Sequence, residues 1–284
     1  MNRKLLLAAP YLLLNGVIIF VALFKGLQVS LGYYPLIGLR DITVNYFKQV
    51  LTTAYFQKSL GYSCYIALTA TFLALVCGIW MAFLLLKTNS SLLQKVISLP
   101  ISLPHIIVAL LALQLFSQTG IISRFFYQIG WINDIGQFPL LIHDVKGYGI
   151  LFVFLYKEIP YVAITILAIL KQLQFGYIDV AKNLGASQVR ILTTIILPMI
   201  QKTICSMFVI LFCFTFASFE VPFLLGNPSY ETVSMAAYDL FTQADLASRP
   251  QAFALNLVMS GICLFVSVLL FVISRLLPGG RSTK

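Results

Sequence analysis

The amino-acid sequence predicts an all-α membrane protein with six transmembrane helices. Hydrophobic side chains make up 60% of its 284 residues and charged side chains only 10%, whereas soluble domains carry about 25% charged residues. The apolar residues gather in six stretches, each close to the roughly 20 residues that a helix needs to cross a bilayer. Little polar sequence remains for a soluble domain, so we expect one membrane domain.

The first predicted helix covers residues 5–24 and follows the basic residues Arg3 and Lys4. A basic start of this kind resembles a secretory signal peptide. However, the apolar run exceeds the about 7–15 residues of a signal sequence, and no A-x-A-like cleavage site follows. We therefore expect a permanent membrane anchor. The other five predicted helices cover residues 60–86, 96–116, 148–170, 203–225 and 252–274.

The distribution of charge predicts the orientation in the membrane. With the amino terminus inside the cell, the cytoplasmic segments hold eleven basic residues and one acid, Asp179, whereas the outer segments hold seven basic and six acidic residues. This asymmetry is the positive-inside bias of membrane proteins. It predicts a multi-pass protein of the bacterial inner membrane with both termini in the cytoplasm. It also explains the net charge of +10 without nucleic acid as a partner.

A long segment, residues 171–202, separates the fourth and fifth predicted helices. A connection of this length predicts a structure or function of its own. Ala181 and Gly185 lie four residues apart, so a helix through them would carry a small-residue spot that another chain can approach closely. Leu184 adds apolar surface beside that spot, while Lys182 keeps the opposite side polar.

The same segment resembles the signature cytoplasmic loop of binding-protein-dependent importer permeases. In that signature, Glu-Ala-Ala is followed after three residues by Gly, and after nine more by Ile-x-Leu-Pro. The corresponding residues in this sequence are Asp179-Val-Ala181, Gly185 and Ile195-Ile-Leu-Pro198. Both gaps match, and five of the seven specified positions are identical. The two departures are Asp for Glu and Val for the first Ala.

The resemblance extends beyond this loop, over residues 58–276. Leu99-Pro-Ile-Ser-Leu-Pro104 and Phe219-Glu-Val-Pro-Phe-Leu-Leu-Gly226 are similar to the branch of the family that transports polyamines, ferric iron, sulfate and thiamine, above all to spermidine/putrescine-type permeases. The resemblance implies the type I fold of ABC importer permeases with a cytoplasmic coupling helix. Residues 1–57 would hold the first helix and a periplasmic segment, residues 58–276 the permease core, and residues 277–284 a cytoplasmic tail.

The resemblance also implies that the loop is gripped by a cytoplasmic ATPase subunit. Ala181 and Gly185 would supply close packing and Asp179 a polar anchor. The other coupling residues would be Lys182, Leu184, Ala186, Ile195, Leu197 and Pro198. A second permease, either a distinct homologue or a second copy, would complete the pathway, and an extracytoplasmic solute-binding protein would deliver the solute.

The chain lacks the residues of a phosphate-binding or catalytic site. No G-x-x-x-x-G-K-[ST] phosphate loop is present, so ATP and Mg²⁺ would be bound by two partner ATPase subunits. The five cysteines lie in apolar stretches without metal-type spacing. We therefore expect a transport subunit that has no cofactor of its own and is not an enzyme.

Four polar residues in or near the predicted helices are candidates for a solute path: Lys157, Glu158, Glu220 and Asn227. An ionisable group inside a membrane helix costs roughly 2.5–3.5 kcal/mol, so it usually faces a cavity or a partner. Structural pairing of Lys157 with Glu220 is the alternative interpretation. The two glutamates suit a cation and Lys157 suits an anion, so these residues leave the charge of the solute open.

The resemblance favours a polyamine as the solute. Ferric iron, thiamine, phosphonates and oxyanions are the alternatives for the same machinery. A secondary transporter or channel is the alternative from another class, but it would be indicated by inverted repeats or paired broken helices, and the sequence shows neither. A membrane enzyme would need a Ser/His/Asp set, paired histidines or a close carboxylate pair.

Overall fold

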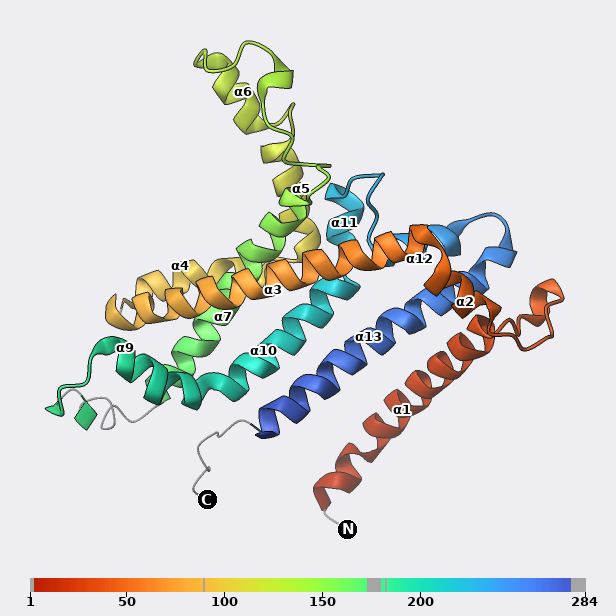
Figure 1. Cartoon of the computed structure of the whole chain (residues 1–284), viewed down its shortest axis with the longest axis horizontal. Helices are drawn as coiled ribbons and strands as arrows, with labels where there is room; N and C mark the ends of the chain where they lie inside the picture. Colours follow the sequence, from red (N-terminus) through yellow and green to blue (C-terminus); the bar gives the residue numbers. More distant parts are fainter. Residues whose placement is uncertain (1–2, 89, 173–179, 182, 277–284) are drawn as a thin grey trace. The chain divides into compact units, whose positions relative to one another are not determined.

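The computed structural model describes residues 3–88, 90–172, 180–181 and 183–276. Within them, six helical stretches are long and apolar enough to cross a membrane, which confirms the predicted all-α fold (Figure 1). These stretches are Ala9–Ser30, Ala54–Thr88, His105–Gln128, Tyr148–Gln172, Thr193–Ala217 and Leu246–Leu276. The chain divides into two compact units, Met1–Leu60 with Val233–Gly261, and Gly61–Thr232 with Ile262–Lys284.

The first unit combines the amino-terminal segment with a segment near the carboxyl end, residues 233–261. Its elements are α1 (Arg3–Ser30), η1 (Pro35–Ile37), α2 (Asn45–Thr52), α12 (Val233–Thr242), η4 (Leu246–Ser248) and the first part of α13 (Arg249–Leu276). The Arg249 guanidinium donates a hydrogen bond to the Tyr34 hydroxyl at 3.0 Å and lies 4.9 Å from the centroid of the Phe241 ring. One cation thus holds three segments of this unit together.

The second unit is built around α7. Its elements are most of α3 (Ala54–Thr88), α4 (Ser91–Ser102), α5 (His105–Phe116), α6 (Ile121–Gln128), η2 (Ile135–Gln137), α7 (Tyr148–Gln172), α9 (Gln188–Ile191), the π-helical turn η3 (Leu192–Ile196), α10 (Leu197–Ala217), α11 (Glu220–Leu225) and the end of α13. Helix α7 contacts α4, α5, α10 and α11. In the most apolar stretch of α7, 61% of the residues are buried. This helix therefore forms the centre of the unit.

The third transmembrane helix begins later than predicted. The sequence predicted one helix over residues 96–116, but α4 ends at Ser102 and α5 starts at His105. Leu103 between them is extended, with φ −80° and ψ 136°. The cause is Pro104, because a proline disfavours helical backbone at the residue before it.

The fifth transmembrane helix is also shifted from its predicted position, residues 203–225. The helical stretch begins at Thr193 and ends at Ala217, and α11 is a separate short helix. Ser218 between them is extended, with ψ 132°. A helix through this point would place Pro222 one turn after Ser218. Pro222 has no N–H to bond the Ser218 carbonyl, and its ring would clash with it.

Helices α3 and α7 approach closely at Gly78. A Cβ atom at Gly78 would lie 2.5 Å from the Val162 Cβ, whereas a Cβ at Gly61 in the same helix would have nothing within 4 Å. We expect Gly78→Ala to lower the stability of the purified chain by about 1–3 kcal/mol through overpacking. The matched control, Gly61→Ala, should stabilise by up to about 1 kcal/mol through helix propensity. Equal melting temperatures for the two variants would contradict this close approach.

Candidate functional site

Two of the predicted solute-path residues line one cavity in the second unit. Lys157 and Glu158 lie in the middle of α7, and the cavity beside them has a volume of about 250 Å³. Its other lining residues come from the end of α4, the start of α5, α7 and α10: Ile101, His105, Tyr161, Ile210, Leu211 and Phe214. The cavity therefore forms where the break between α4 and α5 faces the central helix.

Lys157 is tied to the break between α4 and α5. Its side chain is 7% exposed, and its ammonium group donates a hydrogen bond to the Leu103 carbonyl. The last carbonyls of a helix have no partner within the helix, so the lysine satisfies a group that the break sets free. The structure does not contain the alternative Lys157–Glu220 pair. Glu220 is instead exposed in the first turn of α11.

Glu158 is buried but only half satisfied. The side chain is 3% exposed, and its Oε1 accepts a hydrogen bond from the Thr215 hydroxyl at 2.7 Å. Its Oε2 is buried and has no hydrogen-bond partner in the part of the chain that the structure describes. A buried carboxylate oxygen without a donor is costly. Glu158 thus places an unsatisfied acceptor beside the cavity, although this oxygen has almost no accessible surface of its own.

Aromatic rings line the same cavity. The His105 ring lies 4.6 Å from the Phe214 ring and 6.2 Å from the Phe154 ring, measured between centroids. Tyr161 adds a further ring to the lining. Aromatic faces attract cations, and a carboxylate beside them adds a full negative charge. No group of three His, Cys, Asp or Glu side chains able to hold a metal ion occurs among the described residues.

The other two predicted path residues lie elsewhere. Glu220 does not line the cavity. The Asn227 amide donates to the His143 carbonyl at 2.6 Å, and its oxygen accepts from the Ser229 N–H at 2.8 Å. Asn227 thus fastens the connection between α11 and α12 to the loop before α7.

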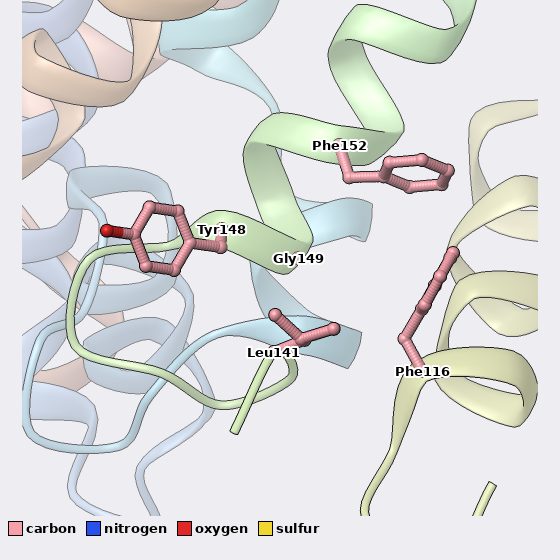
Figure 2. A pocket seen from close by; sticks show the side chains of 5 residues that line it. All are labelled: Phe116, Leu141, Tyr148, Gly149 and Phe152. Atoms are coloured by element: carbon pink, nitrogen blue, oxygen red, sulfur yellow. The ribbon is translucent and has the colours of Figure 1, made fainter. Parts of the chain in front are cut away.

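A second cavity, of about 390 Å³, lies at the start of α7 and is lined by Phe116, Leu141, Tyr148, Gly149 and Phe152. Figure 2 shows the Phe116 and Phe152 rings next to one another, packed edge to face with their centroids 4.8 Å apart. The Tyr148 hydroxyl points away from these rings (Figure 2). Because no lining residue is charged, this cavity is a poorer candidate for a charged solute than the one at Glu158.

The predicted coupling residues are only partly within the described chain, since Asp179 and Lys182 lie outside it. A helical segment ends at Gly185, whose φ is +77°. The Ala186 N–H donates to the Ala181 carbonyl at 2.9 Å, which is the Schellman pattern that terminates helices at a glycine. The expected helix through both Ala181 and Gly185 is therefore corrected, because Gly185 forms the turn that ends it. A Cβ at Gly185 would meet nothing within 4 Å in this chain, and close packing of Gly185 against a partner stays a prediction.

The segment has two different faces. Ala181 and Ala186 contact the buried core that contains Ile196 and Ile200. Val180 and Leu184, one helical turn apart, are 58% and 81% exposed. An apolar side chain as exposed as Leu184 at the tip of a turn is available to a partner surface.

The end of the predicted signature forms the junction into α10. Ile195 contacts the same buried core, whereas Leu197 is 43% exposed. Pro198 lies near the start of α10, directly after the π-helical turn η3. Pro198 has no N–H to donate to the Thr194 carbonyl. The wider π-helical turn before it accommodates this missing hydrogen bond.

Sequence reasoning missed the partners that fix the site. Thr215 is 57 residues from Glu158, and the Leu103 carbonyl is 54 residues from Lys157. A threonine in an apolar stretch and a leucine before a proline carry no signal of such contacts. The flanking Pro100 and Pro104 were the available sign that backbone groups are freed near residue 103.

Comparisons with known proteins agree with this architecture. The sequence model of the family described as "Binding-protein-dependent transport system inner membrane component" matches residues 74–277. The sulfate transport permease CysT of Salmonella typhimurium is 25% identical over 71% of this chain and 69% of its own length. The spermidine/putrescine permease PotC of Escherichia coli K12 is 26% identical over 51% of this chain and 52% of its own length, so the match spans about half of PotC.

A solved structure shares the fold over nearly the whole chain. It is a bacterial ABC transporter that imports the acidic polysaccharide alginate, with a TM-score of 0.75 and 20% sequence identity, covering 99% of this chain and 98% of that one. The same transporter is also known in complex with an alginate pentasaccharide-bound periplasmic protein.

Proposed function

Because the chain belongs to the family of binding-protein-dependent transport system inner membrane components, we propose that it forms half of the pathway by which a polyamine is imported. The chain is a multi-pass permease subunit of a bacterial ABC importer. It is a transport subunit and not an enzyme, since the ATPase of such importers is a separate subunit.

The observation that carries the choice of solute is the free Glu158 Oε2. Lys157 directs its ammonium group at the Leu103 carbonyl, whereas the second oxygen of Glu158 has no donor among the described residues. The group that the cavity leaves unsatisfied is therefore an acceptor. A primary ammonium group satisfies it with charge-assisted hydrogen bonds, and the His105, Tyr161 and Phe214 rings favour the same cation. The likeness to PotC agrees with this choice.

The partners follow from the exposed turn at Val180 and Leu184. We infer that this turn docks on one of two cytoplasmic ATPase subunits, which bind ATP and Mg²⁺. Closure of the ATPases would then move α7 and α10 through the contacts that Ala181 and Ala186 make with the core. A second permease subunit, a distinct homologue in our proposal, closes the open side of the cavity, and a periplasmic binding protein delivers the solute. Both termini lie in the cytoplasm in this arrangement.

An oxyanion such as sulfate is the second candidate solute. Lys157 lines the same cavity, and the match to CysT covers more of this chain than the match to PotC. Under this alternative, Lys157 would exchange its bond to the Leu103 carbonyl for one to the anion. The family and the partners would be unchanged.

Uptake measurements separate the two solutes. Vesicles that hold the complete transporter, supplied with the binding protein, should accumulate labelled spermidine in an ATP-dependent manner, and excess sulfate should not compete. ATP-dependent accumulation of sulfate with no spermidine uptake would overturn the polyamine assignment while leaving the family assignment intact.

A further inference from the structure

A buried carboxylate lies outside the solute cavity, in the loop before α7. Asp144 is 6% exposed, and both of its carboxylate oxygens are buried without a hydrogen-bond partner among the described residues. Tyr62 of α3 is 8% exposed, and its hydroxyl is likewise buried and unpartnered. Three polar oxygens are thus withdrawn from water without a hydrogen-bond partner in the described part of the chain, which is energetically costly.

The Tyr62 hydroxyl and the backbone of Asp144 both lie beside Gly147. A Cβ at Gly147 would lie 2.6 Å from the Tyr62 hydroxyl oxygen, and the Gly147 N–H donates to the Asp144 carbonyl at 3.3 Å. The Asp144 carboxylate acts electrostatically on the Tyr62 hydroxyl. Gly147 has a φ of +72°, so the loop needs a glycine both for its turn and for its closeness to Tyr62.

The loop is fixed on the other side of Asp144 as well. The His143 N–H donates to the Leu225 carbonyl at 3.0 Å, and its Nδ1 donates to the Gly226 carbonyl at 2.8 Å. The His143 carbonyl accepts from the Asn227 amide at 2.6 Å. These bonds fix the backbone before Asp144, and the Gly147 N–H bond to the Asp144 carbonyl fixes it on the other side. The burial of the Asp144 carboxylate is therefore a property of the folded loop.

The charge of the site determines the class of ligand. Lys146, the nearest basic residue in the loop, lies over the Tyr148 ring, with its Nζ 5.8 Å from the centroid, and makes no hydrogen bond to Asp144. Protonation of Asp144 would remove the charge and supply one donor, but the Tyr62 hydroxyl makes no hydrogen bond with this carboxyl group. Ca²⁺ takes six to eight oxygen ligands, commonly with several carboxylates, whereas the site offers one negative charge.

We propose that the Asp144 carboxylate and the Tyr62 hydroxyl bind a monovalent metal cation, Na⁺ or K⁺, that locks the loop before α7 onto α3. The cation takes the oxygens as ligands and neutralises the buried charge, whereas a bridging water would leave that charge in place. This site is separate from the solute cavity, so it does not depend on the proposed solute.

Thermal unfolding of the full-length chain in detergent tests the site. The melting temperature should rise by at least about 3 °C when choline chloride is replaced by NaCl or KCl at equal concentration, and the rise should saturate. Asp144→Asn should abolish the shift, because it removes the charge but keeps the shape. Asp134→Asn, which neutralises an exposed carboxylate of the preceding segment, should keep it.

Tyr62→Phe provides a second variant that keeps the packing of the ring, which lies 6.1 Å from the Tyr230 ring. It should move the midpoint of the Na⁺ or K⁺ titration to a concentration about tenfold higher, since a ligand oxygen is lost. A wild-type melting temperature that is equal in NaCl, KCl and choline chloride would overturn the proposal. So would a shift that persists in Asp144→Asn.

Discussion

Replacing Leu184 by Asp is expected to abolish ATP-driven transport and leave the chain folded in the membrane. Leu184 is 81% exposed at the tip of the turn that ends at Gly185. A side chain that fills a central, desolvated pocket of a partner contributes about 2 kcal/mol or more to binding, and we expect Leu184 to occupy such a pocket. A buried charge in its place costs more still. Solute uptake and solute-stimulated ATP hydrolysis should both fall by about 30-fold or more.

Leu36 supplies the matched control for this substitution. It is an apolar residue of η1 that is 84% exposed, and the sequence places it on the opposite side of the membrane from Leu184. Leu36→Asp should retain transport within about twofold of wild type. If Leu184→Asp transports as well as Leu36→Asp, the turn is not the contact through which the ATPase acts.

Glu158→Gln is expected to lower polyamine uptake by about tenfold or more, because a charge-assisted hydrogen bond of about 1.5–3 kcal/mol is lost. Glutamine keeps the shape of the side chain and can still accept from the Thr215 hydroxyl. It replaces the free Oε2 with an amide donor, which repels an ammonium group. The melting temperature should not fall, since a buried and half-satisfied charge has been removed.

Glu220→Gln is the control for the charge change. Glu220 is exposed and lies outside the cavity, so its neutralisation should change polyamine uptake by less than about twofold. Uptake of a polyamine by Glu158→Gln at the wild-type rate would contradict the proposed role of the carboxylate. A gain in sulfate uptake in this variant would favour the anion alternative.

Hydropathy predicted the number of membrane helices but not where two of them are interrupted. The apolar runs over residues 96–116 and 203–225 continue through Leu103 and Ser218, because a run of apolar residues says nothing about backbone conformation. In both places a proline causes the break locally. Pro104 disfavours helical backbone at Leu103, the residue before it, and Pro222 would clash with the Ser218 carbonyl one turn earlier. Both prolines were visible in the sequence, but Pro100 and Pro160 lie inside helices, so a proline alone does not locate a break.

The charged residues of the candidate site were predictable, because a charged residue is easy to recognise in an apolar stretch of sequence. Lys157 and Glu158 stood out for that reason. Their partners, Thr215 and the Leu103 carbonyl, did not, since these contacts depend on how distant helices pack. The role of Gly185 in coupling stays a prediction, but the sequence analysis did not foresee that this residue ends a helical run. Spacing from Ala181 suggested a contact spot, whereas a glycine after a helical run is also the usual sign of a helix terminus.

The dependence of transport on the ATPase tests the central claim most directly. The wild-type chain and its partner permease should be reconstituted in liposomes with the binding protein, with and without the ATPase subunits and ATP. Accumulation of the solute against its gradient is predicted only when both ATPase and ATP are present. Equal accumulation without them would show that the chain does not work as the permease of an ATP-driven importer.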